Sequence, residues 1–411
     1  MKILQLSHKV PYPPLDGGSI VIHSLTKGLL SLGHRVKVLS IISPKREIGL
    51  NDIDENYKNS VDLGLIKVDT RIKPLEAAKN LFFQKESYHT SRFNSKSFSK
   101  AIEATLKKEE FDIIQLESIF VLNYLSEIRK HSKAKIVLRT QNIEHLIWEG
   151  LIENEKNPLK KWYLKILTKR LKAYELEQMA LLDGVIPITD YDADYLQRKQ
   201  VKAKHLKAIP FGLNLNKFLE ANDSDNSSKA LFHLGSMDWR PNLEAVDWFL
   251  NQVWLKSNLH EKTSLYLAGK FMPERIKNLN NDQLIVQGKI DFPIQYMADK
   301  KIMIVPLLSG SGIRVKIIEG MAMGKVIIST SKGATGIIYT PNKHLLIADT
   351  PEEFQKAILK CLEDEAFCND ISQNAQQLVK EEYGEIQIAK KFIHFYEDLL
   401  CIKQGHAVST R

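Results

Sequence analysis

The clearest candidate for chemistry is a glycine-rich turn at residues 309–312, SGSG, followed closely by Arg314 and Lys316. An apolar run, residues 302–308, comes before the turn, and a helical pattern comes after it. Such a turn leaves backbone N–H groups uncovered at a helix N-terminus, where the helix dipole favours an anion. The two cations add positive charge close to the same point. The pattern predicts a binding site for the diphosphate group of a ligand.

Glu319 narrows the class of diphosphate ligand. It lies about two helical turns beyond the glycines, and the small residues Gly320 and Ala322 follow it. A carboxylate at this point can accept hydrogen bonds from the vicinal hydroxyls of a sugar. The alternative is an ordinary amphipathic helix with a solvated glutamate, because single glycine-rich turns are common. A Walker loop is excluded, since no Gly-Lys-Ser/Thr follows the glycines.

The elements that must position these residues repeat a strand–loop–helix order. Predicted strands at residues 302–308 and 326–329 enclose the helix, which makes a parallel βαβ unit. Earlier strands are predicted at residues 230–234, 265–268 and 284–286. Open α/β sheets bind ligands beyond the carboxyl ends of their strands. The loops after these strands are therefore candidate binding segments.

The first half of the chain has the same rhythm. A strand at residues 2–7, a loop rich in proline and glycine, a helix at 20–32 and a strand at 36–42 form a Rossmann-like unit. Further buried strands are predicted at residues 111–116 and 135–139. The loop contains no G-x-G-x-x-G, which disfavours a dinucleotide site.

Polar residues stand just beyond the two later strands of this half, where a ligand would bind. For one of them, His145, a role in helix capping or packing is at least as well supported as a catalytic role. The residues that we expect to line a cleft or to contact an acceptor are Glu117, Asn142, Glu144 and His145.

Composition and charge limit the class of protein. The 411 residues suit two domains, and no apolar run approaches the roughly 18 residues of a membrane span. The N-terminal residues break at prolines, so we expect no signal peptide and a cytoplasmic protein. The net charge of +9 is unevenly distributed, because residues 1–212 hold 35 Lys/Arg and 25 Asp/Glu, a balance of +10, and the remaining residues have a balance of −1. This basic half, with a lysine-rich helix at 156–182, is compatible with a solvated surface, with an acidic acceptor or with peripheral contact with the inner membrane surface. No module for binding nucleic acid is recognisable.

The segment 302–330 resembles the signature of the retaining glycosyltransferases of family 4, the group 1 glycosyltransferases. Many members carry Glu-x7-Glu, whose second glutamate falls on Glu319. The first falls on Ser311, so this chain is instead similar to a subgroup that reads GSGxRxKxxEAMAxGK. Residues 235–249 resemble that subgroup's first C-terminal loop, and residues 209–214 resemble the IPNGV segment that joins the two domains.

The resemblance implies an α/β protein with the GT-B fold, in which two Rossmann-like domains face a central cleft. The expected domains are an acceptor-binding domain at 1–212 and a nucleotide-sugar-binding domain at 213–384. A helix at 385–402 would cross back to the first domain, and residues 403–411 would form a tail.

The resemblance also implies a set of site residues. Arg314, Lys316 and Glu319 are expected at the catalytic centre, with no bound metal. Other branches place an Arg and a Lys at the positions of Ser236 and Asn242, and we infer that Arg314 and Lys316 replace that charge. The residues expected to bind the donor are Gly17, Gly18, Gly235, Ser236, Asn242, Gly288, Lys289, Ile290, Gly310, Ser311 and Gly312.

The implied activity is transfer of a sugar from a nucleoside-diphosphate sugar, the co-substrate, to a glycan or lipid-linked acceptor. The resemblance implies retention of configuration, no cofactor and a setting in cell-surface polysaccharide or lipopolysaccharide synthesis. Two alternatives are a nucleotide-sugar 2-epimerase of the same fold and a non-catalytic binding module with this fold. The subgroup often has His-Asn where this chain has Gln141-Asn142. The departures at Ser311 and Gln141 keep the second alternative open.

Overall fold

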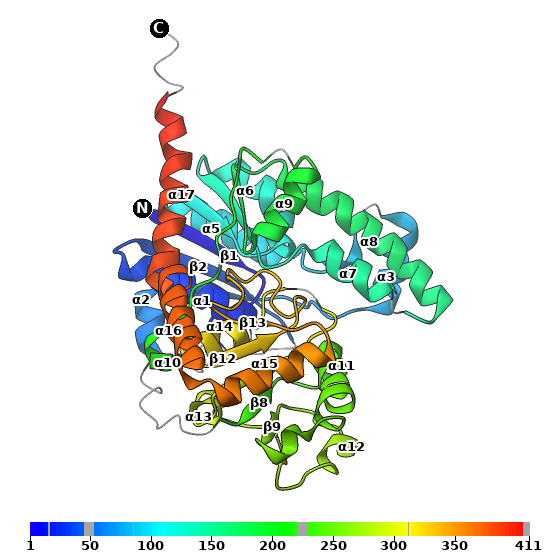
Figure 1. The fold of residues 1–411 in the computed structure, drawn as a ribbon. Coiled ribbons are helices and arrows are strands. Elements are labelled where there is room, and N and C mark those ends of the chain that lie inside the picture. Colours follow the sequence, from blue (N-terminus) through cyan, green and yellow to red (C-terminus); the bar gives the residue numbers. More distant parts are fainter. Residues whose placement is uncertain are drawn as a thin grey trace. The chain divides into compact units, whose positions relative to one another are not determined.

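A computed structural model describes residues 1–14, 17–44, 53–84, 86–153, 155–201, 203–219, 229–310 and 312–405. The chain divides into two compact units. Unit 1 combines Met1–Leu213 with Glu385–Arg411, and unit 2 is Asn214–Gly384. Each unit contains a parallel sheet with helices packed on it (Figure 1). The predicted α/β fold is confirmed.

Unit 1 is built on a seven-stranded sheet in the order β3-β2-β1-β4-β5-β6-β7. The central strands are buried along almost their whole length, as expected for a parallel sheet that is covered on both faces. The strands are β1 (Lys2–Ser7), β2 (Arg35–Ile42), β3 (Asp62–Lys67), β4 (Ile113–Leu116), β5 (Lys135–Thr140), β6 (Gly184–Pro187) and β7 (His205–Leu206).

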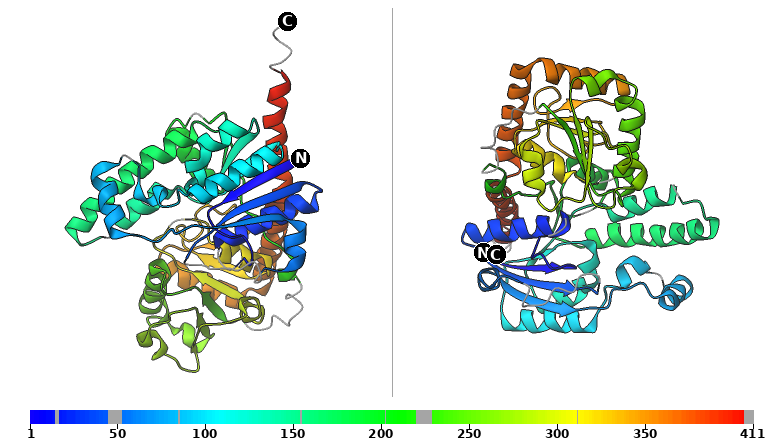
Figure 2. Two further views of the ribbon diagram at one scale, coloured as in Figure 1. Left: turned by 180° about the vertical axis from the view of Figure 1, so that it is seen from behind. Right: turned by 90° about the horizontal axis from the view of Figure 1, so that it is seen from below.

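Helices cover this sheet, and the last one comes from the far end of the sequence. Helix α17 packs against α1 (Figure 2). Gly28 of α1 allows the close approach, because a Cβ there would lie 2.7 Å from the Glu385 carbonyl oxygen. The helices are α1 (Gly17–Ser31), α2 (Glu55–Ser60), α3 (Pro74–Phe83), α4 (Tyr88–Ser91), α5 (Lys96–Lys108), the 3-10 helix η2 (Ile119–Tyr124), α6 (Leu125–His131), α7 (Glu144–Glu153), α8 (Pro158–Met179), α9 (Asp190–Arg198) and α17 (Glu385–Gly405).

Unit 2 has a six-stranded sheet in the order β10-β9-β8-β11-β12-β13. Its strands are β8 (Leu231–Leu234), β9 (Leu265–Ala268), β10 (Leu284–Gly288), β11 (Ile302–Val305), β12 (Val326–Ser329) and β13 (Leu346–Ile347). Its helices are α10 (Asn216–Leu219), α11 (Arg240–Phe249), which continues as a π-helix at Leu250–Trp254, the 3-10 helix η5 (Asn258–Glu261), α12 (Glu274–Lys277), α13 (Pro293–Ala298), α14 (Val315–Ala322), α15 (Pro351–Glu363) and α16 (Glu365–Glu382).

Both sheets reverse their strand order at one point. In unit 1 the reversal falls between β1 and β4, and in unit 2 between β8 and β11. Ligands of open α/β sheets bind outside the carboxyl ends of the strands at such a point. The topology therefore directs attention to the loops after these four strands. Across the described ranges, no helix is both long and apolar enough to cross a bilayer.

Candidate functional site

The loop after β11 brings two cations, Arg314 and Lys316, to the start of α14. β11 ends at Val305, a loop follows, and α14 begins at Val315 with Arg314 as its N-cap residue. Gly310 and Gly312 of this loop have φ of +102° and +81°. L side chains rarely adopt such values, so the loop needs glycine at both positions. Ser311, between them, lies outside the described residues.

Lys316 connects this loop to the one after β8. Its ammonium donates to the Leu234 carbonyl oxygen at 3.0 Å and to Asn242 Oδ1 at 3.2 Å. Within the described residues, these two acceptors use two of its three N–H groups. Burial, with a smaller effect of Arg314, lowers the pKa of Lys316 to about 7. A bound anion would favour the charged form of this lysine.

Arg314 is almost completely buried, with 5% of its surface exposed. Its Nη1 donates to the Gly312 carbonyl oxygen, and its guanidinium lies 5.1 Å from the ring centre of Trp239. Burial lowers its pKa to about 10, so the group stays charged at neutral pH. A Cβ on Gly310 would lie 2.9 Å from the Trp239 ring, which explains the tight contact between the two loops.

Glu319 lies one turn further along α14 and is half-buried. Burial raises the pKa of its carboxyl group to about 7. Among the described residues, its carboxylate makes no hydrogen bond or ion pair. A half-buried carboxylate in this state can accept hydrogen bonds from ligand hydroxyls, which fits the sequence expectation.

The other predicted donor residues divide into two groups. Asn242 Nδ2 donates to the Ser236 carbonyl oxygen at 2.9 Å, and a Cβ on Gly235 would lie 2.7 Å from that Nδ2. Gly235 and Ser236 of the loop after β8 therefore pack tightly against Asn242, in the first turn of α11, beside Lys316. Gly288, at the end of β10, joins the adjacent strand, because its carbonyl oxygen accepts from the Gly269 N–H at 2.6 Å. Among the described residues, no contact links Lys289 or Ile290 to the two cations. Lys289 is exposed and pairs with Asp291 at 2.8 Å, and Ile290 is half-buried.

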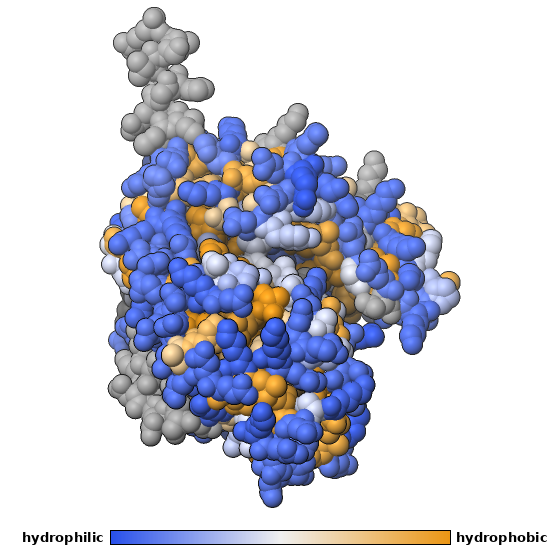
Figure 3. All heavy atoms as spheres, viewed as in Figure 1, coloured by the Kyte–Doolittle hydropathy of each residue, from blue (hydrophilic) through white to orange (hydrophobic). Residues whose placement is uncertain are grey.

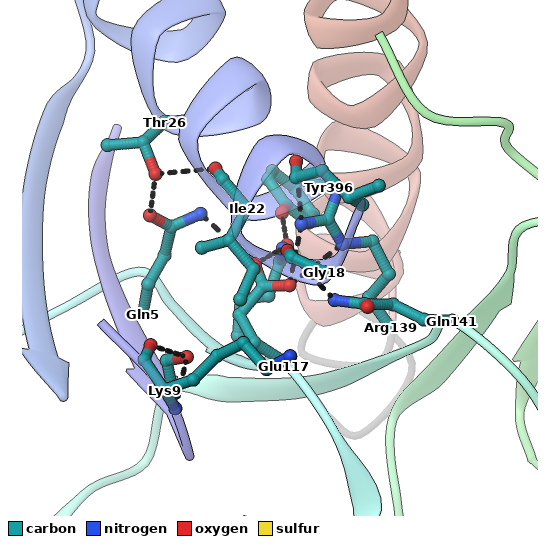
Figure 4. Close-up of polar contacts among 12 residues, drawn as sticks. Gln5, Lys9, Gly18, Ile22, Thr26, Glu117, Arg139, Gln141 and Tyr396 are labelled. Carbon is teal, nitrogen blue, oxygen red and sulfur yellow. Dashed lines mark hydrogen bonds and ion pairs between the residues drawn. The ribbon is translucent and has the colours of Figure 1, made fainter. Parts of the chain in front are cut away.

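In unit 1, the predicted cleft residue Glu117 lies in the protein interior. Its Oε2 accepts from Arg139 Nε at 2.8 Å, and its Oε1 accepts from Gln115 Nε2 at 2.6 Å (Figure 4). Both charged side chains are fully buried. Arg139 also donates to the Val21 carbonyl oxygen of α1 at 3.1 Å. This network joins β4, β5 and α1, so Glu117 holds the framework of the site.

Replacing Glu117 by glutamine is expected to lower the free energy of unfolding by about 3 kcal/mol, because Arg139 would keep a buried charge without its counter-ion. Chemical denaturation measures this. Glu103→Gln is the matched control, since Glu103 pairs with Lys107 at the surface, and it should cost less than about 1 kcal/mol. Equal, small losses for both variants would contradict the structural role of Glu117.

His145 is also buried, and its two ring nitrogens are both engaged. Nδ1 lies 2.6 Å from Glu175 Oε2, and Nε2 lies 2.6 Å from the Tyr195 hydroxyl. The Glu175 carboxylate accepts the backbone N–H groups of Glu144 and His145 at 3.0 and 3.1 Å. It thus caps the first turn of α7. The structure favours the capping and packing interpretation of His145.

Asn142 and Glu144 line a cavity of about 250 Å³ in unit 1. Burial and the nearby Glu175 raise the pKa of Glu144 to about 7, and Lys9 acts in the opposite direction. Gly17 and Gly18 begin α1, where the Gly18 carbonyl oxygen accepts from Gln141 Nε2 at 3.4 Å (Figure 4). Asp16 lies outside the described residues. The residues lining the cavity are His8, Lys9, Ser118, Ile119, Phe120, Thr140, Gln141, Asn142 and Glu144.

Sequence reasoning missed three residues that shape these sites. His233 of β8 is fully buried, and its Nδ1 lies 3.0 Å from the Ile304 carbonyl oxygen. Burial and Lys316 hold its pKa well below the usual value. Trp239 packs on Arg314, and Glu175 caps α7. The sequence gives no signal for His233 or Glu175, whereas Trp239 stands in a segment that resembles the family.

Two family models match the chain. One, described as Glycosyltransferase Family 4, matches residues 15–217, and one, described as Glycosyl transferases group 1, matches residues 228–364. An uncharacterized 44.6 kDa protein in the cps region of Klebsiella pneumoniae is 25% identical over 410 residues, covering 94% of this chain and 97% of its own. An uncharacterized glycosyltransferase of Methanocaldococcus jannaschii is 24% identical over 317 residues, covering 72% of this chain and 77% of its own.

Solved structures resemble the fold along almost the whole chain. Sucrose-phosphate synthase from Thermosynechococcus elongatus has a TM-score of 0.69 and 18% identity, covering 98% of this chain and 100% of its own. Anabaena HepE in complex with UDP has a TM-score of 0.65 and 12% identity, covering 97% of this chain and 100% of its own. At these identities, the likeness is one of fold.

Proposed function

This chain belongs to the group 1 glycosyltransferases of the family 4 type, which have the GT-B fold, and we propose that unit 2 holds its donor, a nucleoside-diphosphate sugar. One observation carries the assignment of the donor site. Lys316 and Arg314 meet the glycine-rich loop at the helix N-terminus, at the point where the strand order reverses. The complex of HepE with UDP supports a nucleoside diphosphate as the ligand of this fold.

The chemistry proposed for this site is stabilisation of a leaving group. When the bond between sugar and diphosphate breaks, negative charge grows on the diphosphate oxygens. Two cations and helix N–H groups that are already in place lower the energy of that charge. Glu319 would hold donor hydroxyls. The family resemblance supports retention of configuration through attack on the same face, with no enzymic nucleophile.

Unit 1 is proposed to hold the acceptor, a glycan or a lipid-linked sugar. The cavity beside Asn142 and Glu144 has the amide and carboxylate groups that bind sugar hydroxyls. The Klebsiella relative in a cps region supports a place in cell-surface polysaccharide or lipopolysaccharide synthesis. For this setting we propose a cytoplasmic enzyme whose basic unit 1 contacts the inner membrane surface.

Glu319→Gln tests the donor site. Because it removes a charged acceptor, we expect donor binding to weaken by about 1.5–3 kcal/mol. The raised pKa of Glu319 also predicts the direction of a pH effect, because the wild-type carboxylate becomes protonated as the pH falls through about 7. Lys316 gains its charge over the same pH range. On the acid side of pH 7, the donor affinity of the wild type should therefore fall relative to that of Glu319→Gln, which keeps only the dependence due to Lys316. Titration calorimetry from pH 5.5 to 8 measures both effects. Unchanged affinity in the variant would remove Glu319 from the site.

The enzyme is proposed to work without a metal. Arg314 and the helix N-terminus supply positive charge to the diphosphate, and Lys316 adds its charge when the anion binds. Activity should stay within about two-fold when a chelator is added. The assay is release of the nucleoside diphosphate, with and without EDTA. A loss of activity that added Mg²⁺ or Mn²⁺ restores would refute the proposal. A separate experiment, analysis of the products formed from the donor when no acceptor is present, distinguishes a sugar transferase from a 2-epimerase.

A further inference from the structure

Unit 1 exposes an unusual group of large apolar side chains, which we call the apolar tip. Phe83 is 84% exposed, Leu75 80%, Leu159 79% and Phe82 73%. Soluble surfaces rarely leave adjacent aromatic side chains this open, and such patches usually mark an interaction site. The apolar tip consists of Ile72, Leu75, Phe82 and Phe83 on and before α3, and of Leu159 and Trp162 on α8.

Helix α3 exposes large apolar side chains, which an ordinary surface helix buries. Its buried residues are the small Ala77 and the polar Asn80, whereas Leu75, Phe82 and Phe83 are exposed. An isolated surface helix buries its large apolar residues and exposes polar ones. The folded chain therefore leaves the apolar face of α3 exposed.

Contacts between α3 and α8 place the two parts of the apolar tip on one structure. Arg170 of α8 donates to the carbonyl oxygens of Asn80 and Leu81 at 3.0 and 2.8 Å. Ala77 of α3 packs in a small cluster with Leu167 and Tyr163 of α8. Tyr163 directly follows Trp162, so α3 lies against the N-terminal half of α8. In Figure 3, orange atoms stand among blue ones where Figure 1 labels α3, α7 and α8.

Strong positive charge accompanies the apolar tip. Residues 156–172, which include the first part of α8, contain seven Lys or Arg and no Asp or Glu. Lys160 and Lys161 lie between Leu159 and Trp162 in the sequence, and Lys165 follows Trp162. An isologous contact between two copies would place these like charges face to face. Lys160 pairs with Glu155 at 2.6 Å and Lys172 with Glu149 at 2.9 Å, and the segment keeps an excess of positive charge. The combination of exposed aromatic side chains and this excess of lysines fits the interface of an anionic bilayer.

We propose that the apolar tip is the membrane-contact surface of this protein, with its aromatic side chains at the headgroup level of an anionic bilayer. The lysines of α8 bind the lipid phosphates, and the exposed face of α3 buries its apolar surface. The inference deepens the proposed function, since it names the surface by which unit 1 reaches a membrane where lipid-linked acceptors reside. It does not depend on which sugar is transferred.

Sedimentation of the full-length protein with vesicles tests the proposal. The vesicles contain phosphatidylcholine with or without phosphatidylglycerol. We expect the wild type to bind only the anionic vesicles and to be released by high salt. Phe82→Ser/Phe83→Ser and Lys160→Gln/Lys161→Gln/Lys165→Gln should each lower the partition coefficient at least about ten-fold.

Matched controls come from exposed residues elsewhere. Lys96→Gln/Lys100→Gln/Lys108→Gln removes the same charge from α5 of the same unit. Leu181→Ser/Leu255→Ser removes two exposed apolar side chains outside the apolar tip. Both controls should bind anionic vesicles within about two-fold of the wild type.

Three results would overturn the proposal. They are absence of binding to anionic vesicles, tip variants that bind like the controls, and a wild-type dimer in light scattering that Phe82→Ser/Phe83→Ser turns into a monomer.

Binding of UDP and GDP is measured on the same preparations. If tip variants bind the nucleotide but not the vesicles, both proposals stand. Vesicle binding without nucleotide binding would contradict the donor site alone.

Discussion

Lys316→Met should lower kcat by about a thousand-fold, because the diphosphate would lose a preorganised, half-buried cation at the moment when its charge grows. The variant also leaves the Leu234 carbonyl oxygen and Asn242 Oδ1 without this donor. Since methionine also removes the cost of burying a charge, the free energy of unfolding should fall by no more than about 2 kcal/mol. Steady-state kinetics and chemical denaturation measure the two effects separately.

Lys325→Met is the matched control for this prediction. Lys325 is buried in the same unit, beyond the other end of α14, and donates to the Ala298 carbonyl oxygen at 2.7 Å. Its burial lowers the pKa to about 8, so it resembles Lys316 in environment. We expect a similar loss of stability with kcat within about two-fold of the wild type. Equal losses of kcat in the two variants would assign the effect of Lys316 to folding.

Arg314→Ala should lower kcat by about a hundred- to a thousand-fold, with a smaller change in the KM for the donor. The guanidinium is expected to bind the leaving diphosphate more strongly in the transition state than in the ground state. Arg314→Lys should give an intermediate kcat, because it keeps the charge but loses the planar stacking on Trp239.

Arg275→Ala provides the control for Arg314, since Arg275 pairs with Asp247 at the surface of the same unit. It should leave both kinetic parameters within about two-fold of the wild type. A loss confined to KM in Arg314→Ala would mean that Arg314 only anchors the donor.

Much of the fold could be predicted because parallel strands buried on both faces have long apolar runs. β9 and β12 have the predicted bounds, and β11 stops earlier than predicted, at Val305, because Pro306 has no N–H for the sheet. β3 was not predicted. Its sequence, DLGLIK, is only half-buried at the sheet edge and lacks a strong pattern. Helix α3 was not predicted either, and periodicity alone would have turned Phe82 and Phe83 inward.

The candidate site was predictable where chemistry lies within one segment. Arg314 precedes α14 directly, and Lys316 and Glu319 lie within this helix. Their spacing in the sequence therefore predicts that they lie close together. Glu117 and His145 show the limit of such reasoning. Each stands beyond a strand, yet each is buried by a partner that spacing does not reveal: Arg139 for Glu117 and Glu175 for His145. Whether a side chain at the end of a strand is buried or exposed depends on tertiary packing.

The central claim is that the loop before α14 binds the diphosphate of the donor, and proton-linked calorimetry tests it most directly. UDP, GDP and ADP are titrated at pH 8 in two buffers that differ in ionisation enthalpy. Because the pKa of Lys316 in the free protein is about 7, the lysine is mostly neutral there and must be charged to hold the anion. We predict one binding site for at least one nucleotide, with uptake of about one proton. In Lys316→Met, weak residual binding should take up none. A well-folded wild type that binds none of the nucleotides, or a variant that binds with the same affinity and proton uptake, would contradict the claim.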